Sequence, residues 1–179
     1  MSIVAFDGKE VFYDSICVGS DFREFVVEKV HISNDNRLVS CSVGVWGMAC
    51  SVVQDFFDRT RANPELLEQD IFIPSTELSE KVLEDYSGDI IIIDTVRQRL
   101  WLYDEYINGF GAVPYKPFII GHERAQAIVA LSVDATDEDK WDKIAFDLSV
   151  VQNSHHFNDR VTAAPYKVID LASLATRDV

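Results

Sequence analysis

The chain has 179 residues, of which 47% are hydrophobic and 26% charged, as expected for a globular protein with one ample core. Its formal net charge of −14 argues against binding to nucleic acid or to an anionic membrane, because both partners are negative. No apolar run approaches the ~18 residues that suggest a membrane span, and no basic-then-apolar secretory signal opens the chain.

The cysteines and histidines give no support for a metal or another cofactor. Cys17, Cys41 and Cys50 lie in apolar stretches without a CxxC spacing, which indicates reduced core cysteines in a cytoplasmic protein. His155 and His156 are adjacent in a polar loop, and no further ligand follows at a fitting spacing. We therefore expect no cofactor and no metal.

The first half of the chain predicts two hairpins followed by a helix. Asp7-Gly8 is a strong turn dipeptide between two strands, and Asn34-Asp35-Asn36 separates two more. Apolar residues at helical spacing begin at Trp46 and predict a helix with one buried stripe. The four predicted strands cover residues 2–6, 10–17, 25–33 and 37–43.

The second half predicts an elaboration, further strands and two helices. Residues 61–88 are read as an elaboration of the core, with Pro64 at the first position of a short helix. A central strand is expected at 89–94, and a loop is expected around Gly109, Gly111, Pro114 and Pro117. Thr136 with Asp139 predicts the start of the last helix. The other predicted elements are strands at 100–103, 118–120 and 166–171 and a helix at 122–133.

Strands and helices thus come in blocks and do not alternate. This order disfavours a doubly wound parallel sheet and favours sheets covered by helices. We predict a single α+β domain over residues 1–179. Its architecture is a four-layer α-β-β-α sandwich, with two mostly antiparallel sheets between helices.

Several segments occur in the order found in one family. Residues 2–9 (Ser-Ile-Val-Ala-Phe-Asp-Gly-Lys) form an opening hairpin, Asp14-Ser15 and Lys29-Val30 follow, and residues 38–47 form a strand and glycine turn before a helix. Residues 90–103 and 118–127 continue the series with a hairpin and a strand–glycine–helix segment. Over most of its length the chain resembles proteasome β-subunits and HslV, which are N-terminal-nucleophile (Ntn) hydrolases.

The resemblance implies a set of catalytic residues. Ser2 takes the place of the family's N-terminal threonine, Asp14 orients the site, and Lys29 lowers the proton affinity of the α-amino group. Gly44 or Gly47 supplies a backbone N–H to the oxyanion. The chemistry is coherent, because an amine with an ordinary pKa of about 7.7–8.0 can take the serine proton near neutrality, and a nearby ammonium disfavours amine protonation.

The sequence also departs from the family pattern. Serine replaces threonine, so the methyl group that fixes the hydroxyl rotamer is absent. The family's Gly-Ser-Gly element reads Gly121-His122-Glu123. His122 either substitutes for the lost serine or caps the following helix. The amine exists on Ser2 only after Met1 is removed.

Two main functions follow from these observations. The first is a peptidase that cuts peptides or unfolded proteins inside a homo-oligomeric ring, with an unfoldase as a further partner implied by the resemblance. The second is a catalytically inactive structural or assembly subunit with the same fold. An Ntn amidase acting on a small molecule shares the nucleophile and differs in the size of its pocket.

Overall fold

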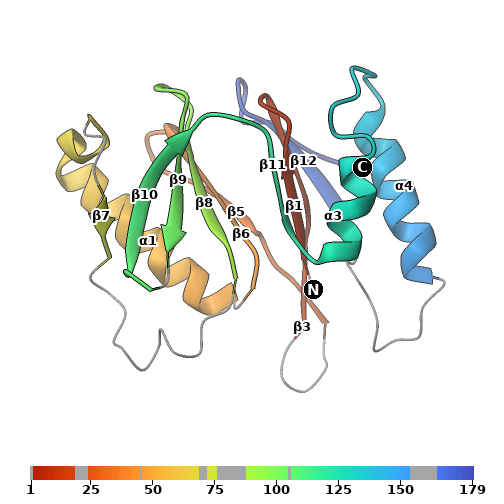
Figure 1. Cartoon of the computed structure of the whole chain (residues 1–179), viewed down its shortest axis with the longest axis horizontal. Coiled ribbons are helices and arrows are strands. Elements are labelled where there is room, and N and C mark those ends of the chain that lie inside the picture. The colour runs from red at the N-terminus through yellow and green to blue at the C-terminus, as the bar shows by residue number, and fades with distance from the viewer. Residues whose placement is uncertain are drawn as a thin grey trace. The chain divides into compact units, whose positions relative to one another are not determined.

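The structure is a computed structural model that describes residues 2–18, 24–44, 46–68, 72–75, 88–104, 106–153 and 165–179. The chain divides into two compact units, one formed by Met1–Lys29 with Lys116–Val179 and one by Val30–Tyr115. Figure 1 shows both units and labels most of their elements. The single domain expected for residues 1–179 stays a prediction.

The first unit is built on a five-stranded antiparallel sheet in the order β11-β1-β2-β12-β13. The hairpin β1–β2 is the one predicted at Asp7-Gly8, with Val4 opposite Tyr13 in its register. β12 pairs with the other edge of β2, so β2 is the central strand. The strands are β1 (Ile3–Phe6), β2 (Glu10–Asp14), β11 (Phe118–Gly121), β12 (Tyr166–Asp170) and β13 (Thr176–Asp178).

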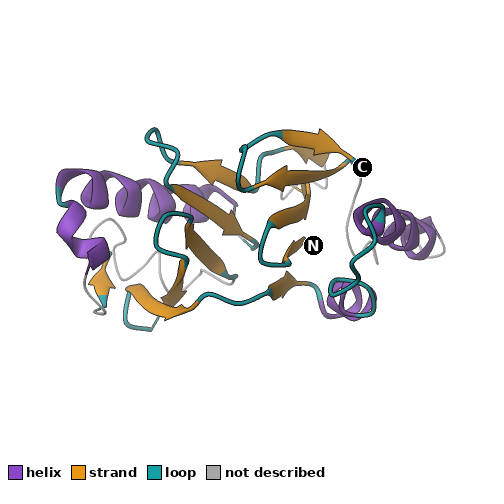
Figure 2. Ribbon diagram, turned by 90° about the horizontal axis from the view of Figure 1, so that it is seen from above, coloured by secondary structure: helices purple, strands orange, loops and turns teal. Residues whose placement is uncertain are grey.

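Two helices, α3 (Glu123–Ala130) and α4 (Lys140–Asn153), cover one face of this sheet and lie side by side, as Figure 2 shows. The ring of Phe12 stacks on Trp141 with centroids 5.4 Å apart and on Tyr166 with centroids 5.5 Å apart. These rings fill the space between helix and sheet. The apolar face predicted for the last helix is buried here and consists of Trp141, Ile144, Ala145 and Leu148.

A small two-stranded sheet also belongs to the first unit. It is the antiparallel hairpin of β3 (Ile16–Val18) and β4 (Glu24–Val26). The sequence predicts residues 10–17 as one strand, but the structure interrupts that strand at Ser15. Because β4 runs back along β3, the hairpin returns the chain from Asp14 to Lys29.

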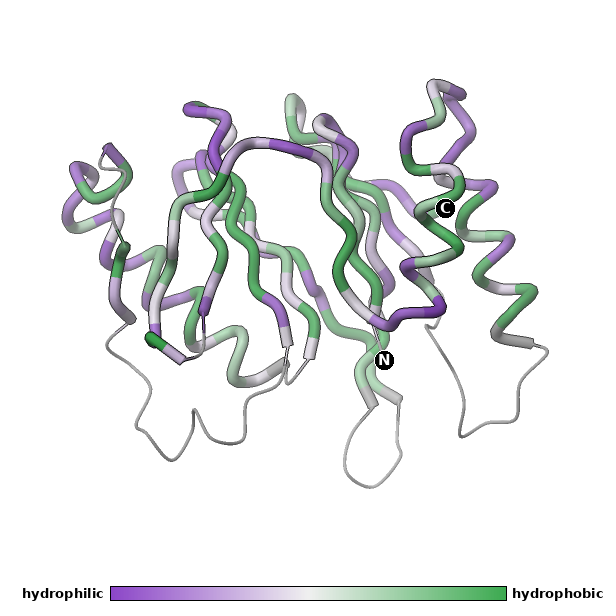
Figure 3. The backbone as a smooth tube through the Cα atoms, viewed as in Figure 1, coloured by the Kyte–Doolittle hydropathy of each residue, from purple (hydrophilic) through white to green (hydrophobic). Residues whose placement is uncertain are grey.

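The second unit contains a six-stranded antiparallel sheet in the order β5-β6-β8-β9-β10-β7. Helix α1 (Trp46–Ala62) and the 3-10 helix η1 (Pro64–Glu68) pack on it through a core that includes Phe56 and Trp101. Figure 3 shows hydrophobic residues concentrated along the strands and hydrophilic residues at the turns. The strands are β5 (Val30–Ile32), β6 (Leu38–Ser42), β7 (Ile73–Pro74), β8 (Ile90–Asp94), β9 (Arg99–Asp104) and β10 (Gly109–Pro114).

The second unit confirms the predicted central strand. All five residues of β8 are buried, and the strand lies between β6 and β9. Its last residue, Asp94, is fully buried and accepts hydrogen bonds from the guanidinium of Arg37 and from the backbone N–H groups of Val96 and Arg97. This buried carboxylate is therefore satisfied by a cation and a turn.

Three further sequence predictions are wrong. The strand predicted at 25–33 is two strands, β4 and β5, and residues 27–29 between them, including Lys29, are not in a strand. The loop expected around Gly109, Gly111 and Pro114 is strand β10, which pairs with β9 and β7. Glycine in a strand often marks a close approach of backbones, and a Cβ at Gly109 would lie 2.6 Å from the carbonyl oxygen of Ile73. Helix α4 begins at Lys140, later than a cap at Thr136 would place it.

The described elements define an α+β protein in which each unit carries an antiparallel sheet covered by helices. Among the described residues, no helix is long and apolar enough to cross a membrane. The elaboration predicted at 61–88 contains the end of α1, η1 and β7, and residues 69–71 and 76–87 of it lie outside the described residues.

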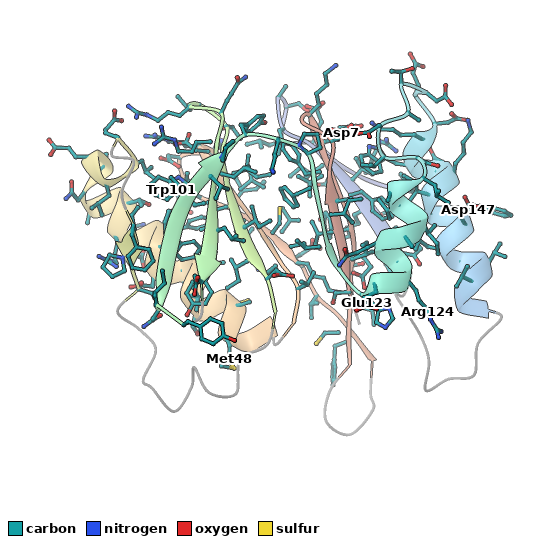
Figure 4. All side chains as sticks on the ribbon, in the orientation of Figure 1. Asp7, Met48, Trp101, Glu123, Arg124 and Asp147 are labelled. Atoms are coloured by element: carbon teal, nitrogen blue, oxygen red, sulfur yellow. The ribbon has the colours of Figure 1, made fainter. Side chains whose placement is uncertain are left out.

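The side chain of Asp7, which Figure 4 labels, links the β1–β2 turn to Lys140, the first residue of α4. Its carboxylate accepts hydrogen bonds from the backbone N–H groups of Lys9 and Glu10, each at 2.8 Å, and forms an ion pair with Lys140. Burial alone would raise the pKa of Asp7, but these donors outweigh it and hold the pKa below the ordinary value of 3.8.

We predict that Asp7→Asn lowers the free energy of unfolding by about 2 kcal/mol at pH 7, because a charged acceptor is lost from three donors. The folded-state pKa of Asp7 is below the unfolded value, so this stabilisation is complete above pH 3.8 and is lost as the pH falls through the lowered pKa. Urea unfolding at several pH values measures the difference between variant and wild type.

The matched control is Asp58→Asn, which breaks an exposed pair with Arg61 and should change stability by less than about 0.5 kcal/mol. An Asp7→Asn penalty that stayed constant well below pH 3.8 would contradict this account.

Candidate active site

Three side chains predicted from the sequence meet at the start of β1, all within the first unit. The Nζ atom of Lys29 lies 2.8 Å from the Oγ atom of Ser2 and 2.7 Å from Oδ2 of Asp14. The other carboxylate oxygen of Asp14 accepts a hydrogen bond from the backbone N–H of Ile3 at 2.8 Å. Asp14 therefore links the lysine to the strand that carries Ser2.

Strand pairing explains why these residues come together. The β1–β2 register continues from Val4 opposite Tyr13, so Asp14 at the end of β2 lies beside the first residue of β1. The β3–β4 hairpin then returns the chain, and the backbone N–H of Val27 donates to the carbonyl of Ser15 at 2.8 Å. Lys29 follows two residues later.

The ion pair between Lys29 and Asp14 is almost completely enclosed. Asp14 has no exposed surface, and Lys29 is 3% exposed. Burial raises the pKa of the Asp14 carboxyl and lowers the pKa of the Lys29 ammonium, while the attraction between the two groups opposes both shifts. Perturbed ionisable groups that contact a hydroxyl are typical of functional sites, although structural ion pairs also show such shifts.

The backbone of Ser2 is held by a contact that sequence reasoning missed. The carbonyl oxygen of Ser2 accepts a hydrogen bond from the backbone N–H of His122 at 2.9 Å. Gly121 has a φ angle of 129°, and a Cβ at this position would lie 2.1 Å from the Ser2 carbonyl oxygen. Only glycine fits there without moving Ser2. The signal available in the sequence is the glycine at the end of an apolar strand.

The side chain of His122 caps helix α3. Its Nδ1 atom accepts a hydrogen bond from the backbone N–H of Arg124 at 3.3 Å, at the helix start where Figure 4 labels Glu123 and Arg124. This is the capping role weighed against a role beside Ser2. An imidazole acceptor at this position satisfies one of the unpaired N–H groups of the first helical turn.

Gly44 and Gly47 belong to the other unit. Gly44 is an exposed residue of the turn between β6 and α1, and Gly47 lies in the first turn of α1. Backbone N–H groups in a first turn have no partner within the helix, so they are available to an anion. The oxyanion role of both glycines stays a prediction.

Two further sequence predictions concern residues outside those that the structure describes. Met1 is one of these residues, so its removal stays a prediction. His155 and His156, the adjacent histidines of the polar loop, also lie outside the described residues. Among the residues that the structure does describe, no group of three His, Cys, Asp or Glu side chains is arranged to hold a metal ion.

A cavity of about 520 Å³ lies in the second unit between the β5–β6 turn and helix α1. Cys50 and His31 line it, with Sγ and Nε2 3.6 Å apart. Burial raises the pKa of the Cys50 thiol, so the thiol stays protonated and a poor nucleophile. Ser2, Asp14 and Lys29 are not among the lining residues of this cavity.

Comparison with known proteins identifies the fold. No protein-family model and no curated protein matches the sequence. Similar solved structures include Anbu (ancestral beta-subunit) from Yersinia bercovieri, with a TM-score of 0.62 and 14% identity, covering 100% of this chain and 87% of that one. Eukaryotic HslV from Trypanosoma brucei has a TM-score of 0.57 and 15% identity, covering 93% of this chain and 96% of that one.

A third similar structure is the Anbu (Gly-1) mutant from Hyphomicrobium sp. strain MC1, with a TM-score of 0.57 and 14% identity. It covers 99% of this chain and 85% of that one. At such identities the likeness shows the fold alone. The chain has the fold of HslV and Anbu, the Ntn-hydrolase fold, and this confirms the predicted fold class.

We predict that Lys29→Met lowers the free energy of unfolding by roughly 3–5 kcal/mol at neutral pH, because it leaves the Asp14 carboxylate buried and unpaired. The folded-state pKa of that carboxyl then lies still further above 3.8, so the variant loses stability as the pH rises and regains it as the pH falls. Urea unfolding between pH 4.5 and pH 8 measures this trend.

The matched variant is Lys29→Met combined with Asp14→Asn. The asparagine is neutral and still accepts the hydrogen bond from Ile3, so the double variant should recover most of the loss. Equal stability of the single and double variants at pH 8 would contradict the proposed charge penalty.

Proposed function

We propose that the chain is a proteasome-like peptidase whose nucleophile is the hydroxyl of Ser2, with the α-amino group of Ser2 as the base after removal of Met1. The observation that carries this proposal is the 2.8 Å contact between Lys29 Nζ and Ser2 Oγ, beside a buried Asp14, in a chain with the fold of HslV. A surface lysine next to an ordinary second residue would not require this enclosure.

The proposed reaction has two stages. Ser2 Oγ attacks the carbonyl carbon of a peptide bond while the α-amine takes the hydroxyl proton and then passes it to the leaving amine. Water hydrolyses the resulting ester and restores the hydroxyl. The ammonium of Lys29 donates to Oγ and lowers the proton affinity of the α-amine, and Asp14 holds that ammonium in place. Gly44 or Gly47 is proposed to donate a backbone N–H to the oxyanion.

The proposed setting is a homo-oligomeric ring in the cytoplasm that receives peptides or unfolded proteins, with an unfoldase as partner. The likeness to HslV and to an ancestral beta-subunit supports an assembly of copies. Exposed apolar side chains also support it, because large apolar groups on a surface favour protein contacts. Phe146 is 68% exposed and Val150 is 51% exposed, one helical turn apart on α4.

The inactive structural subunit is the second candidate. It is favoured by one observation, that His122 occupies the place of a serine in the family's Gly-Ser-Gly element and uses its side chain to cap α3. A hydroxyl that supports the amine is therefore missing at this position. Direct tests of Ser2 chemistry separate the two candidates.

We predict that protein lacking Met1 hydrolyses short peptides and that an acylating probe labels Ser2, because the free α-amine then acts as base. Protein that retains Met1 should be inert, because its α-amine is not on Ser2. Intact-mass measurement establishes the state of residue 1, and peptide mapping locates the label.

Ser2→Ala should abolish hydrolysis and labelling while circular dichroism shows an unchanged fold, because the half-buried hydroxyl does not support the core. Equal labelling with and without Met1 would refute the amine as base. Absence of label in both forms would refute the peptidase proposal and favour the structural subunit.

We predict that the native protein sediments as a symmetric oligomer of many copies at micromolar concentration, because apolar residues exposed on α4 in the single chain are removed from water when they pack between subunits. Analytical ultracentrifugation measures the mass of the assembly. Phe146→Lys should weaken the assembly, and Asp147→Asn, which makes the same charge change of one positive unit at an exposed position of the same helix, is the matched control. A wild-type monomer would contradict the ring proposal.

A further inference from the structure

Lys29 is not held by a strand of its own. β4 ends at Val26 and β5 begins at Val30, so Lys29 lies on an irregular connection of three residues. A side chain on such a connection reaches a fixed point only if the connection itself is fixed. The distance from its ammonium to Ser2 therefore depends on what binds residues 27 and 28.

Two ties bind this connection to the end of β2. The backbone N–H of Val27 donates to the carbonyl of Ser15 at 2.8 Å, and the hydroxyl of Tyr13 donates to Oε2 of Glu28 at 3.0 Å. Tyr13 and Ser15 are the two neighbours of Asp14. The two residues on either side of Asp14 therefore bind the two residues that come before Lys29.

A second lysine, Lys167, also binds the carboxylate of Glu28. Lys167 on β12 lies opposite Tyr13 in the sheet register, and its ammonium forms an ion pair with Oε1 of Glu28. The carboxylate of Glu28 therefore has a donor on each oxygen, one of them from a phenol that is only 2% exposed. A carboxylate held at both oxygens has little freedom to rotate.

We propose that Glu28, clamped by Tyr13 and Lys167, is a positioning residue that sets the place of the Lys29 ammonium against Ser2 and Asp14. The inference rests on the proposed peptidase function for its catalytic consequence, but the placement of Lys29 can be measured without activity. Glu28 itself does not touch the reacting atoms in this account.

The clamp is poorly suited to a role in stability alone. The Glu28 side chain is 50% exposed, and ion pairs at that exposure contribute little to folding. Positioning is far more sensitive, because an ångström of misplacement can reduce a rate by up to ~10²-fold. Loss of the clamp should therefore slow the chemistry of Ser2 while leaving the unfolding temperature unchanged.

The test uses the full chain without Met1, so that the α-amino group is on Ser2. Four variants of this protein are compared with it. Tyr13→Phe removes only the hydroxyl, and Glu28→Ala removes the whole carboxylate. Lys167→Met removes the cation, and Lys167→Arg restores it. Asp137→Asn, which breaks an exposed ion pair with Lys143 before helix α4, is the matched control.

Two measurements are made on each protein. Trace acetylation with acetic anhydride, followed by peptide mass spectrometry, reports the accessibility of the Lys29 amine relative to the other lysines. The inactivation rate constant and the binding constant for an acylating probe report the chemistry of Ser2. Thermal unfolding confirms that each variant is folded.

The expected result is a several-fold rise in Lys29 acetylation in Tyr13→Phe, Glu28→Ala and Lys167→Met. The Ser2 inactivation rate constant should fall about tenfold with little change in probe binding, within the range that misplacement allows. Lys167→Arg and Asp137→Asn should behave like the wild type.

Wild-type acetylation of Lys29 in both Tyr13→Phe and Glu28→Ala would overturn the clamp, even if Ser2 is labelled normally and the peptidase proposal stands. If Ser2 of the wild type is never labelled while Lys29 acetylation rises in those variants, the peptidase proposal fails and the clamp on Lys29 is supported.

Discussion

The ion pair between Lys29 and Asp14 is the contact on which the arrangement of the candidate site depends. Two opposite charges are removed from water, with 3% and no exposed surface, and each would be expensive to bury alone. Their attraction and the hydrogen bond from Ile3 to Asp14 offset that cost. A hydrophobic pair of similar volume would often be at least as stable. Stability alone therefore does not explain why these charges are buried. Besides Asp14, the Lys29 ammonium contacts the Ser2 hydroxyl, and this contact suggests a functional role.

The sheet of the first unit is what makes this pair feasible. Asp14 ends the central strand β2, and its backbone pairs with Tyr166 on one side while its carboxylate reaches Ile3 on the other. The backbone N–H of His122, the residue after β11, donates to the carbonyl of Ser2, and Gly121 leaves room for that carbonyl. Ser2 is therefore fixed through its main chain before its hydroxyl meets Lys29. The hydroxyl, the carboxylate and the ammonium each come from a different segment, but hydrogen bonds within one unit place all three.

Local patterns in the sequence were enough to predict some of these features. The hairpin at Asp7-Gly8 is set by turn chemistry, and the buried strand at 90–94 by a run of β-branched residues, so both were predicted correctly. Strand β10 was missed because two glycines and a proline suggest a loop. Its strand conformation depends on pairing with β9 and β7, which no local pattern reports.

The same distinction applies to the site. Ser2, Asp14 and Lys29 could be selected because they occur in a recognisable order, and the structure brings them together. The contacts of Tyr13, Glu28 and Lys167 could not be predicted, because they join residues up to 139 positions apart through the register of β2 and β12. In the sequence, Glu28 is simply an acidic neighbour of Lys29. Gly121 carried a weak signal as a glycine at a strand end, but only the position of the Ser2 carbonyl shows why a side chain is excluded.

Under the proposed function, serine stands where the resembled family has threonine, and this gives the surrounding contacts a specific role. A threonine hydroxyl is restricted by its methyl group, whereas a serine side chain rotates among three staggered positions. Here the Ser2 hydroxyl is instead restricted from outside, by a hydrogen bond from an ammonium that has almost no freedom to move away from Asp14. The orientation of this hydroxyl, the proposed nucleophile, then depends on the placement of Lys29, and thus on the connection that carries it. If the proposed function is correct, a serine without that methyl group is oriented only while Lys29 is held in place. The contacts of Glu28 would then matter more for activity than its 50% side-chain exposure suggests for stability.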